Sequence, residues 1–204
     1  LPAAGAPDAF VVRLIAPADF RQALHNTVAR TRLGVLRVVP RIAARVLTDQ
    51  RERERFMKQL GREHFLGARA PSGDVLYQVV EDAAGNWCGL LLWCSAALRL
   101  KDRDVWIGWD AHQRSQRLKL VVNNARFLLP ESARRRNLAS RVLAVSVAAL
   151  ALQYETQYGY RPLLAETFTD PRKHKGTCYL AAGWMPVGQT AGYGRHRAEF
   201  LNHH

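Results

Sequence analysis

The sequence predicts a single α/β (α+β) domain in which helices are inserted between the strands of a mixed, twisted sheet. Short runs of β-branched and aromatic residues alternate along the chain with stretches of helical spacing. A long helical pattern over residues 137–158 separates two strand-like runs, and such a connection is typical of a parallel crossover. With 204 residues, 48% of them hydrophobic, the chain is long and apolar enough to bury one core.

The part of the chain before residue 124 combines strands with charged helices. The segment DQRERERFMKQL at residues 49–60 predicts a charged helix with one apolar face. Turn signals at Ser72-Gly73 and at residues 83–86 predict a hairpin. In chain order, the expected elements are a strand at 11–15, a helix at 18–30, a strand at 35–39, a helix at 49–60, strands at 75–80, 87–97 and 105–109, and a helix at 111–123.

The remainder is expected to form a strand, a long helix, a strand, a short helix and a strand. These elements are predicted at 126–129, 137–158, 163–168, 176–183 and 184–189. Gly159 is expected to end the long helix. Alternation in the strand 163–168 places Leu164, Glu166 and Phe168 on one face. The Glu166 carboxylate is therefore either buried and paired or lining a cleft.

We expect three parts in the chain. Residues 1–50 hold strands and a helix that join a preceding region, residues 51–197 form the core, and residues 198–204 form a flexible tail. The first residues lack the basic and apolar segments of a signal peptide. Cys88, Cys94 and Cys178 show no pairing pattern, which favours reduced thiols in a cytoplasmic protein. The uncharged stretch 142–154 is shorter than the roughly 20 residues that span a membrane, so no membrane association is expected.

The charge of the chain indicates a polyanionic partner. Thirty Lys and Arg against 17 Asp and Glu give a net charge of +13. This charge favours nucleic acid as the partner, and we expect DNA rather than RNA. The alternative is a basic surface that is only solvated. Aromatic residues that could stack on bases, or serve as core residues, lie between the basic ones. The residues expected to bind nucleic acid or another anion are Arg126, Arg134, Arg135, Arg136, Arg141, Lys175 and Arg195, within clusters that also hold Arg172, Lys173, His174, His196 and Arg197.

Candidate catalytic residues are His64, Asp104, Glu166 and Cys178, because His and carboxylates supply acid–base chemistry and Cys supplies a nucleophile. Each has a simpler alternative. His64 could form hydrogen bonds in a loop, Asp104 could pair with Arg103, and Cys178 could be a small core residue. His174 and Cys178 have helical i, i+4 spacing, but without a second close pair they predict no metal site.

Two segments resemble GNAT acyltransferases. The turn at residues 134–139 stands between a strand and a helix, where that family binds the pyrophosphate of coenzyme A, and residues 178–188 are similar to the end of its fold. The resemblance implies a GNAT-like scaffold and an acetyl-CoA site. Asn137 replaces a glycine that permits close backbone approach, which argues against acetyl-CoA binding. We assign no cofactor.

A second, denser resemblance covers about residues 52–197. The motifs HFLG, RD, IGW, NN, RFL, NLAS, ETF and GTCY occur in that order, beginning at residues 64, 103, 107, 123, 126, 137, 166 and 176. In this order they resemble the DruA family of Druantia anti-phage defence systems. The resemblance implies a role in defence, a large helicase-like partner protein, and relatives that accompany transposases.

These observations leave three hypotheses for the function. The first is a DNA-associated defence or mobile-element protein with a basic cleft, in which His64, Asp104 and Glu166 form a reactive site. The second is an acyltransferase that holds a CoA-type cofactor at the Arg134 turn. The third is a non-catalytic adaptor that recruits a helicase. Convergence of the candidate residues on one pocket would favour the first, and their dispersal would favour the third.

Overall fold

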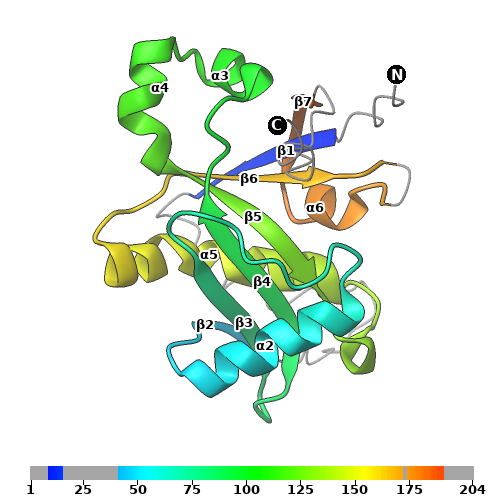
Figure 1. Ribbon diagram of the computed structural model, residues 1–204. Coiled ribbons are helices and arrows are strands. Elements are labelled where there is room, and N and C mark those ends of the chain that lie inside the picture. Colours follow the sequence, from blue (N-terminus) through cyan, green and yellow to red (C-terminus); the bar gives the residue numbers. More distant parts are fainter. Residues whose placement is uncertain (1–8, 16–40, 172–173, 191–204) are drawn as a thin grey trace, which may run out of the picture.

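The computed structural model describes residues 9–15, 41–171 and 174–190. In this part of the chain, seven strands form one open mixed sheet in the order β2-β3-β4-β5-β6-β1-β7, accompanied by five α-helices (Figure 1). The mixed α/β class predicted from the sequence is confirmed. The helix expected at 18–30 and the strand expected at 35–39 lie outside the described residues.

The strands are β1 (Ala9–Leu14), β2 (Ile42–Val46), β3 (Leu76–Asp82), β4 (Trp87–Ser95), β5 (Val121–Leu128), β6 (Leu164–Thr169) and β7 (Met185–Gln189). The predicted β3–β4 hairpin is confirmed, with the Asp82 carboxylate accepting the backbone N–H groups of Ala84 and Asn86 in its turn. All neighbouring pairs are antiparallel except β5 and β6. The helix between these two strands therefore makes the parallel crossover that the sequence predicts.

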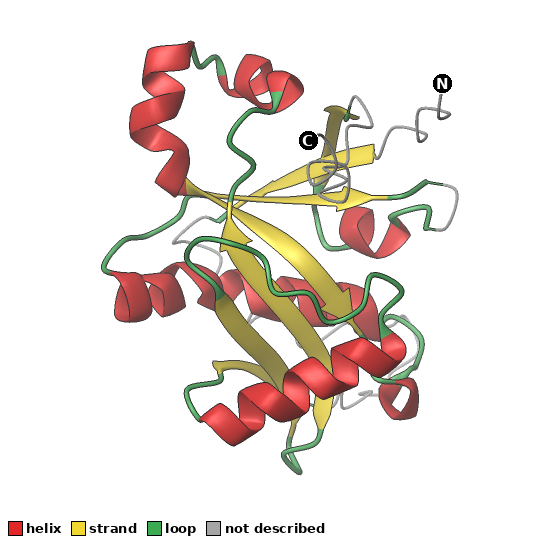
Figure 2. Ribbon diagram, in the orientation of Figure 1, coloured by secondary structure: helices red, strands yellow, loops and turns green. Residues whose placement is uncertain are grey.

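Helices cover both faces of the sheet (Figure 2). The crossover helix α5 (Leu138–Tyr158) buries Leu143 and Leu150 against one face, and α2 (Gln50–Glu63) buries Phe56 and Leu60 against the other. Each such side chain contributes about 1.5–3 kcal/mol when it is fully removed from water.

A glycine in β4 sets how closely α5 approaches the sheet. A Cβ atom at Gly89 would lie 2.4 Å from Val142 Cγ1, so any larger residue there would push α5 off the sheet. The helix ends as predicted at Gly159, which has a φ of 78° and donates its N–H to the Glu155 carbonyl. The helix α5 is long and apolar enough to cross a membrane, but the core helices of globular proteins meet the same criteria of length and composition. Here it forms the centre of the core, with Leu150 and Tyr154 fully buried.

The prediction of a strand at 105–109 is wrong, and the helix predicted at 111–123 begins as expected but is shorter. The expected strand at 105–109 is part of the helix α3 (Lys101–Ile107), which ends at Gly108 with a φ of 81°. The expected helix at 111–123 is confined to α4 (Ala111–Arg117) and a turn of 3-10 helix, and β5 begins at Val121. Tertiary pairing decides these differences: Val121 and Val122 pair with β6, whereas Val105 stays exposed on a short helix.

A buried charge cluster attaches α3 to the sheet. Arg103 and Glu166 are both 0% exposed, and their Nη1 and Oε2 atoms lie 3.1 Å apart. Arg103 also donates to the Asp104 carboxylate at 2.9 Å and to the Ala97 carbonyl at 2.8 Å, while Glu166 accepts the Ala97 N–H at 2.9 Å. Arg114 of α4 completes the cluster through Asp104. Burial raises the pKa of Glu166, and the neighbouring Arg103 opposes that change.

We predict that Glu166→Gln lowers the free energy of unfolding, because it removes one of the two carboxylates that pair with the buried Arg103 and leaves Asp104 as the other. Removing one partner of a buried ion pair costs about 3–5 kcal/mol, and the glutamine, which retains hydrogen bonds, should lie at or below the lower limit. Urea unfolding measures the loss. Glu155→Gln is the control, since its pair with Arg161 lies on the surface and should leave stability nearly unchanged.

A Glu166→Gln protein as stable as the wild type that no longer protects against phage would contradict this prediction. That result would restore Glu166 as a reactive group.

Candidate functional site

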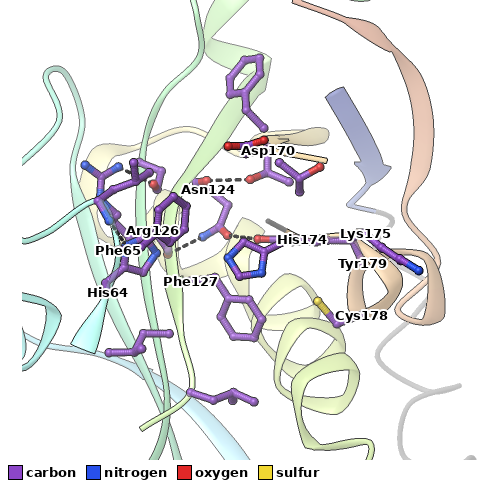
Figure 3. Close-up of a pocket in the computed structure, with 18 of the residues that line it drawn as sticks. His64, Phe65, Asn124, Arg126, Phe127, Asp170, His174, Lys175, Cys178 and Tyr179 are labelled. Carbon is purple, nitrogen blue, oxygen red and sulfur yellow. Dashed lines mark hydrogen bonds between the residues drawn. The ribbon is translucent and has the colours of Figure 1, made fainter. Parts of the chain in front are cut away.

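The candidate site lies where the two parallel strands separate. β5 and β6 pair from Val121 to Asn123 and from Leu164 to Glu166. Beyond these residues β5 continues beside β4, whereas β6 continues beside β1, and the two strands diverge in Figure 1. A cavity of about 600 Å³ occupies the gap (Figure 3). Its walls come from the end of α2 and the following loop, from β5 and Arg134, from the end of β6, and from the start of α6 (Thr177–Ala181).

A β-bulge in β5 distributes the side chains around this gap. Leu92 pairs with Arg126 and Trp93 pairs with Asn124, which leaves Ala125 as the extra residue. Trp93 belongs to the core beneath α5, and Leu92 belongs to the core beneath α2. The bulge therefore directs Asn124 and Arg126 to opposite faces of the sheet within two residues.

Asn124 connects three walls of the cavity. It is 3% exposed, its Nδ2 donates to the Arg126 carbonyl at 3.1 Å, and its Oδ1 accepts the Tyr179 hydroxyl at 3.2 Å. Its own carbonyl accepts the Thr167 hydroxyl at 2.9 Å. These bonds join β5, β6 and α6 where no backbone pairing joins them, as Figure 3 shows. Asn124 was not among the residues predicted from the sequence; a buried amide inside a strand was the available signal.

Arg126 contributes a partly buried positive charge to the cavity. Its guanidinium donates to the Gly67 carbonyl at 3.3 Å and to the Ala125 carbonyl at 2.7 Å. No carboxylate forms an ion pair with it among residues 9–15, 41–171 and 174–190. Burial lowers the pKa of Arg126, which is the expected effect on a cation that is not fully compensated.

The other charges on the wall leave an excess of positive charge. Arg134 and Lys175 line the cavity together with Arg126, and the carboxylates that line it are Glu63 and Asp170. Glu63 already accepts the Glu131 N–H at 3.0 Å, which engages part of its negative charge. The cavity is therefore better suited to an anion than to a cation.

His64 lines the cavity as a neutral ring. It follows α2 directly, and its Nδ1 accepts the Leu66 N–H at 3.1 Å, so the ring proton lies on Nε2. Burial lowers the pKa of His64 to about 4, and the charges of Arg126 and His174 act in the same direction. The ring stacks on Phe65 with 4.9 Å between centroids. This geometry matches the loop hydrogen bond that was the simpler alternative for His64.

The remaining candidate catalytic residues divide between two places. Cys178 lines the cavity and is half-buried, and burial raises the pKa of its thiol, so the nucleophilic thiolate is disfavoured at neutral pH. Asp104 and Glu166 belong to the Arg103 cluster and do not line the cavity. The alternation predicted for β6 explains the division, because Thr167 faces the cavity while Glu166 faces α3.

The predicted anion-binding residues also divide. Arg126, Arg134 and Lys175 line the cavity, whereas Arg135 and Arg141 lie near Cys88 and Asp82 by the β3–β4 hairpin.

Arg136 is exposed on the Arg134 turn and does not line the cavity. Arg195 lies outside the described residues, as do Arg172, Lys173, His196 and Arg197. Within the described ranges, no group of three His, Cys, Asp or Glu side chains could hold a metal ion.

Sequence reasoning missed Phe65, a residue that is 51% exposed at the cavity wall and whose ring centroid lies 5.2 Å from that of His174. Its place in the HFLG motif that begins at residue 64 was the available signal. Phe127, Tyr179 and Trp184 are among the aromatic residues that lie between basic ones in the sequence. They pack edge to face in or against the core, with centroid distances of 6.1 Å and 5.1 Å, and Phe127 and Tyr179 also line the cavity.

Fold and site together describe a mixed α/β protein with a cavity between two diverging parallel strands. A family model described as Druantia protein DruA matches residues 20–202. The chain therefore belongs to the DruA family, as its motifs indicated, and this membership implies a role in Druantia anti-phage defence, with the other Druantia proteins as candidate partners. A comparison with curated proteins gave no match.

We predict that His64 makes the protein less stable as the pH falls. Because its pKa is lowered from 6.5 to about 4, the unfolded chain binds a proton between these values that the folded protein does not. The free energy of unfolding should therefore fall as the pH drops from 6.5 towards 4. Urea unfolding at pH 7 and pH 5 should show a smaller fall for His64→Gln, whose side chain does not titrate. Equal falls in the two proteins would contradict the buried neutral ring.

Proposed function

We propose that this protein binds DNA through the cavity between β5 and β6 as its contribution to anti-phage defence. The observation that carries the proposal is Arg126, a partly buried guanidinium that lines the cavity and forms no ion pair with a carboxylate among the described residues. An anion that entered the cavity would supply the missing negative charge. The net charge of +13 supports a polyanion as the source of that anion.

The geometry favours binding over catalysis at this cavity. Of the candidate reactive groups, His64 is neutral with Nδ1 occupied by a hydrogen bond, Cys178 is a half-buried thiol, and Glu166 and Asp104 lie in the Arg103 cluster. A general base needs a free lone pair within reach of the substrate. The dispersal of these residues favours the hypothesis of a non-catalytic protein, and we therefore propose that it recognises DNA without acting on it and that any chemistry on the nucleic acid is supplied by the helicase-like partner. The proposed location is the cytoplasm.

We predict that Arg134→Ala weakens DNA binding more than Arg136→Ala. The two arginines are exposed on the same turn, but Arg134 lines the cavity and Arg136 does not, so each serves as the charge-matched control for the other. Binding of a labelled oligonucleotide should weaken steeply as salt rises. Loss of one phosphate contact should reduce the slope of log K against log salt by about 1 for Arg134→Ala.

Absence of binding at low salt would refute the proposed function. Equal effects of Arg134→Ala and Arg136→Ala would move the binding surface away from the cavity.

The second candidate function is that of a CoA-dependent acyltransferase. One observation favours it: Asn137 has a φ of 62°, a backbone conformation that glycine adopts readily, directly before α5. The turn thus has a glycine-like backbone at the place where GNAT acyltransferases hold a pyrophosphate. The Asn137 side chain, however, adds atoms where that family has none, and this favours the DNA-binding proposal.

For this reason we expect no heat of binding when acetyl-CoA is titrated into the protein in a calorimeter. A clear binding signal that Arg134→Ala weakens would instead support the acyltransferase.

A further inference from the structure

Arg126 also lines a second, smaller cavity. This cavity, of about 270 Å³, is bounded by Arg69, Ala70, Pro71, Ser72 and Arg126. Arg69 and Arg126 are close enough for the charge of Arg69 to lower the pKa of Arg126, after the larger effect of burial. Neither arginine forms an ion pair with a carboxylate of residues 9–15, 41–171 or 174–190. Two arginines that share a cavity whose lining has no carboxylate offer donors of the kind that pair with phosphate.

An aromatic ring stands at the wall of the larger cavity, on the other side of Arg126. Phe65 contacts two histidine rings: it stacks on His64 with an interplanar angle of 20° and is tilted by 51° to His174. These contacts fix the Phe65 ring while half of its surface remains exposed. A fixed, exposed aromatic ring beside arginines is the usual platform on which proteins stack an unpaired base.

The floor of the larger cavity retains hydrogen-bonding capacity. The Asn124 side chain can form up to four hydrogen bonds, and the structure uses one through Nδ2 and one through Oδ1. The volume of about 600 Å³ lies within the roughly 300–1,000 Å³ of small-molecule pockets. It can admit a single base, and a paired base inside a duplex cannot reach it without leaving the stack.

We propose that the site binds an unpaired nucleotide, with its base stacked on Phe65 in the larger cavity and its phosphate held by Arg126 and Arg69 at the smaller one. This inference rests on the proposed DNA-binding function and specifies its ligand as single-stranded nucleic acid or a base flipped out of a duplex. Arg126 is the common wall of the two cavities, so it lies where the base joins its backbone.

The test measures the affinity of the full chain for a fluorescent single strand and for a hairpin duplex of the same sequence, at several salt concentrations. The wild type should prefer the single strand. Phe65→Ala should weaken single-strand binding by about 5- to 150-fold, the loss associated with one stacked base, and should weaken duplex binding less, because a paired base does not stack on the ring. Phe65→Trp should retain the preference, because the larger ring also stacks.

Two further variants complete the test. Arg69→Ala should reduce the salt slope for single strands by about 0.7, the value for one phosphate. Trp106→Ala is the control for loss of an aromatic side chain, because Trp106 is 43% exposed on α3 and lines neither cavity. Thermal unfolding checks that each variant is folded.

The outcomes separate this inference from the proposed function. Binding of duplex and single strand with equal affinity, unaffected by Phe65→Ala, would overturn the unpaired-nucleotide site and leave DNA binding intact. Absence of binding to either ligand at low salt would overturn both. A single-strand preference lost equally in Phe65→Ala and Trp106→Ala would also overturn the assignment, because the effect would not be specific to the cavity.

Discussion

The short parallel pairing of β5 and β6 is the constraint on which the rest of the structure depends. Parallel neighbours require a long crossover, and α5 supplies it and thereby forms the centre of the core. The pairing then stops, so the backbone groups along the two separated edges need other partners. Side chains provide some of them: the Thr167 hydroxyl bonds to the Asn124 carbonyl, and the Asn124 amide bonds to the Arg126 carbonyl. For this reason polar groups line part of the cavity between the strands, beside apolar side chains such as Phe127 and Leu129.

The two faces of β6 show how one strand can serve both stability and recognition. Glu166 points towards α3 and ends in a cluster of charges that neutralise one another, while the adjacent Thr167 points into the cavity. Arg126 lies in β5, close to this division, and lacks a carboxylate among the described residues. A charge that is compensated within the protein holds elements together, and one that is not compensated remains available to a ligand.

The sequence was most informative where local chemistry decides the structure. The β3–β4 hairpin, the helix end at Gly159 and the alternation around Glu166 depend on residues close in sequence, and all could be predicted. The strand expected at 105–109 failed because its apolar residues fit a short helix equally well once Gly108 ends it. The cavity could not be predicted, because the bulge at Ala125 and the contact between Phe65 and His174 depend on distant partners.

The assembly of the cavity from distant segments also affects the folding of the protein. Its walls come from residues 63–66, 124–129, 134, 167–170 and 174–179, so the chain must close long loops before the walls meet. Contacts between residues far apart in the sequence form late and slowly, because closing the loop between them costs entropy before the contacts contribute any stability. A nascent chain still missing β6 has no cavity, however complete its hairpin and α2 are. Ligand binding would thus appear only when the chain has finished folding, and would report on the integrity of the whole sheet.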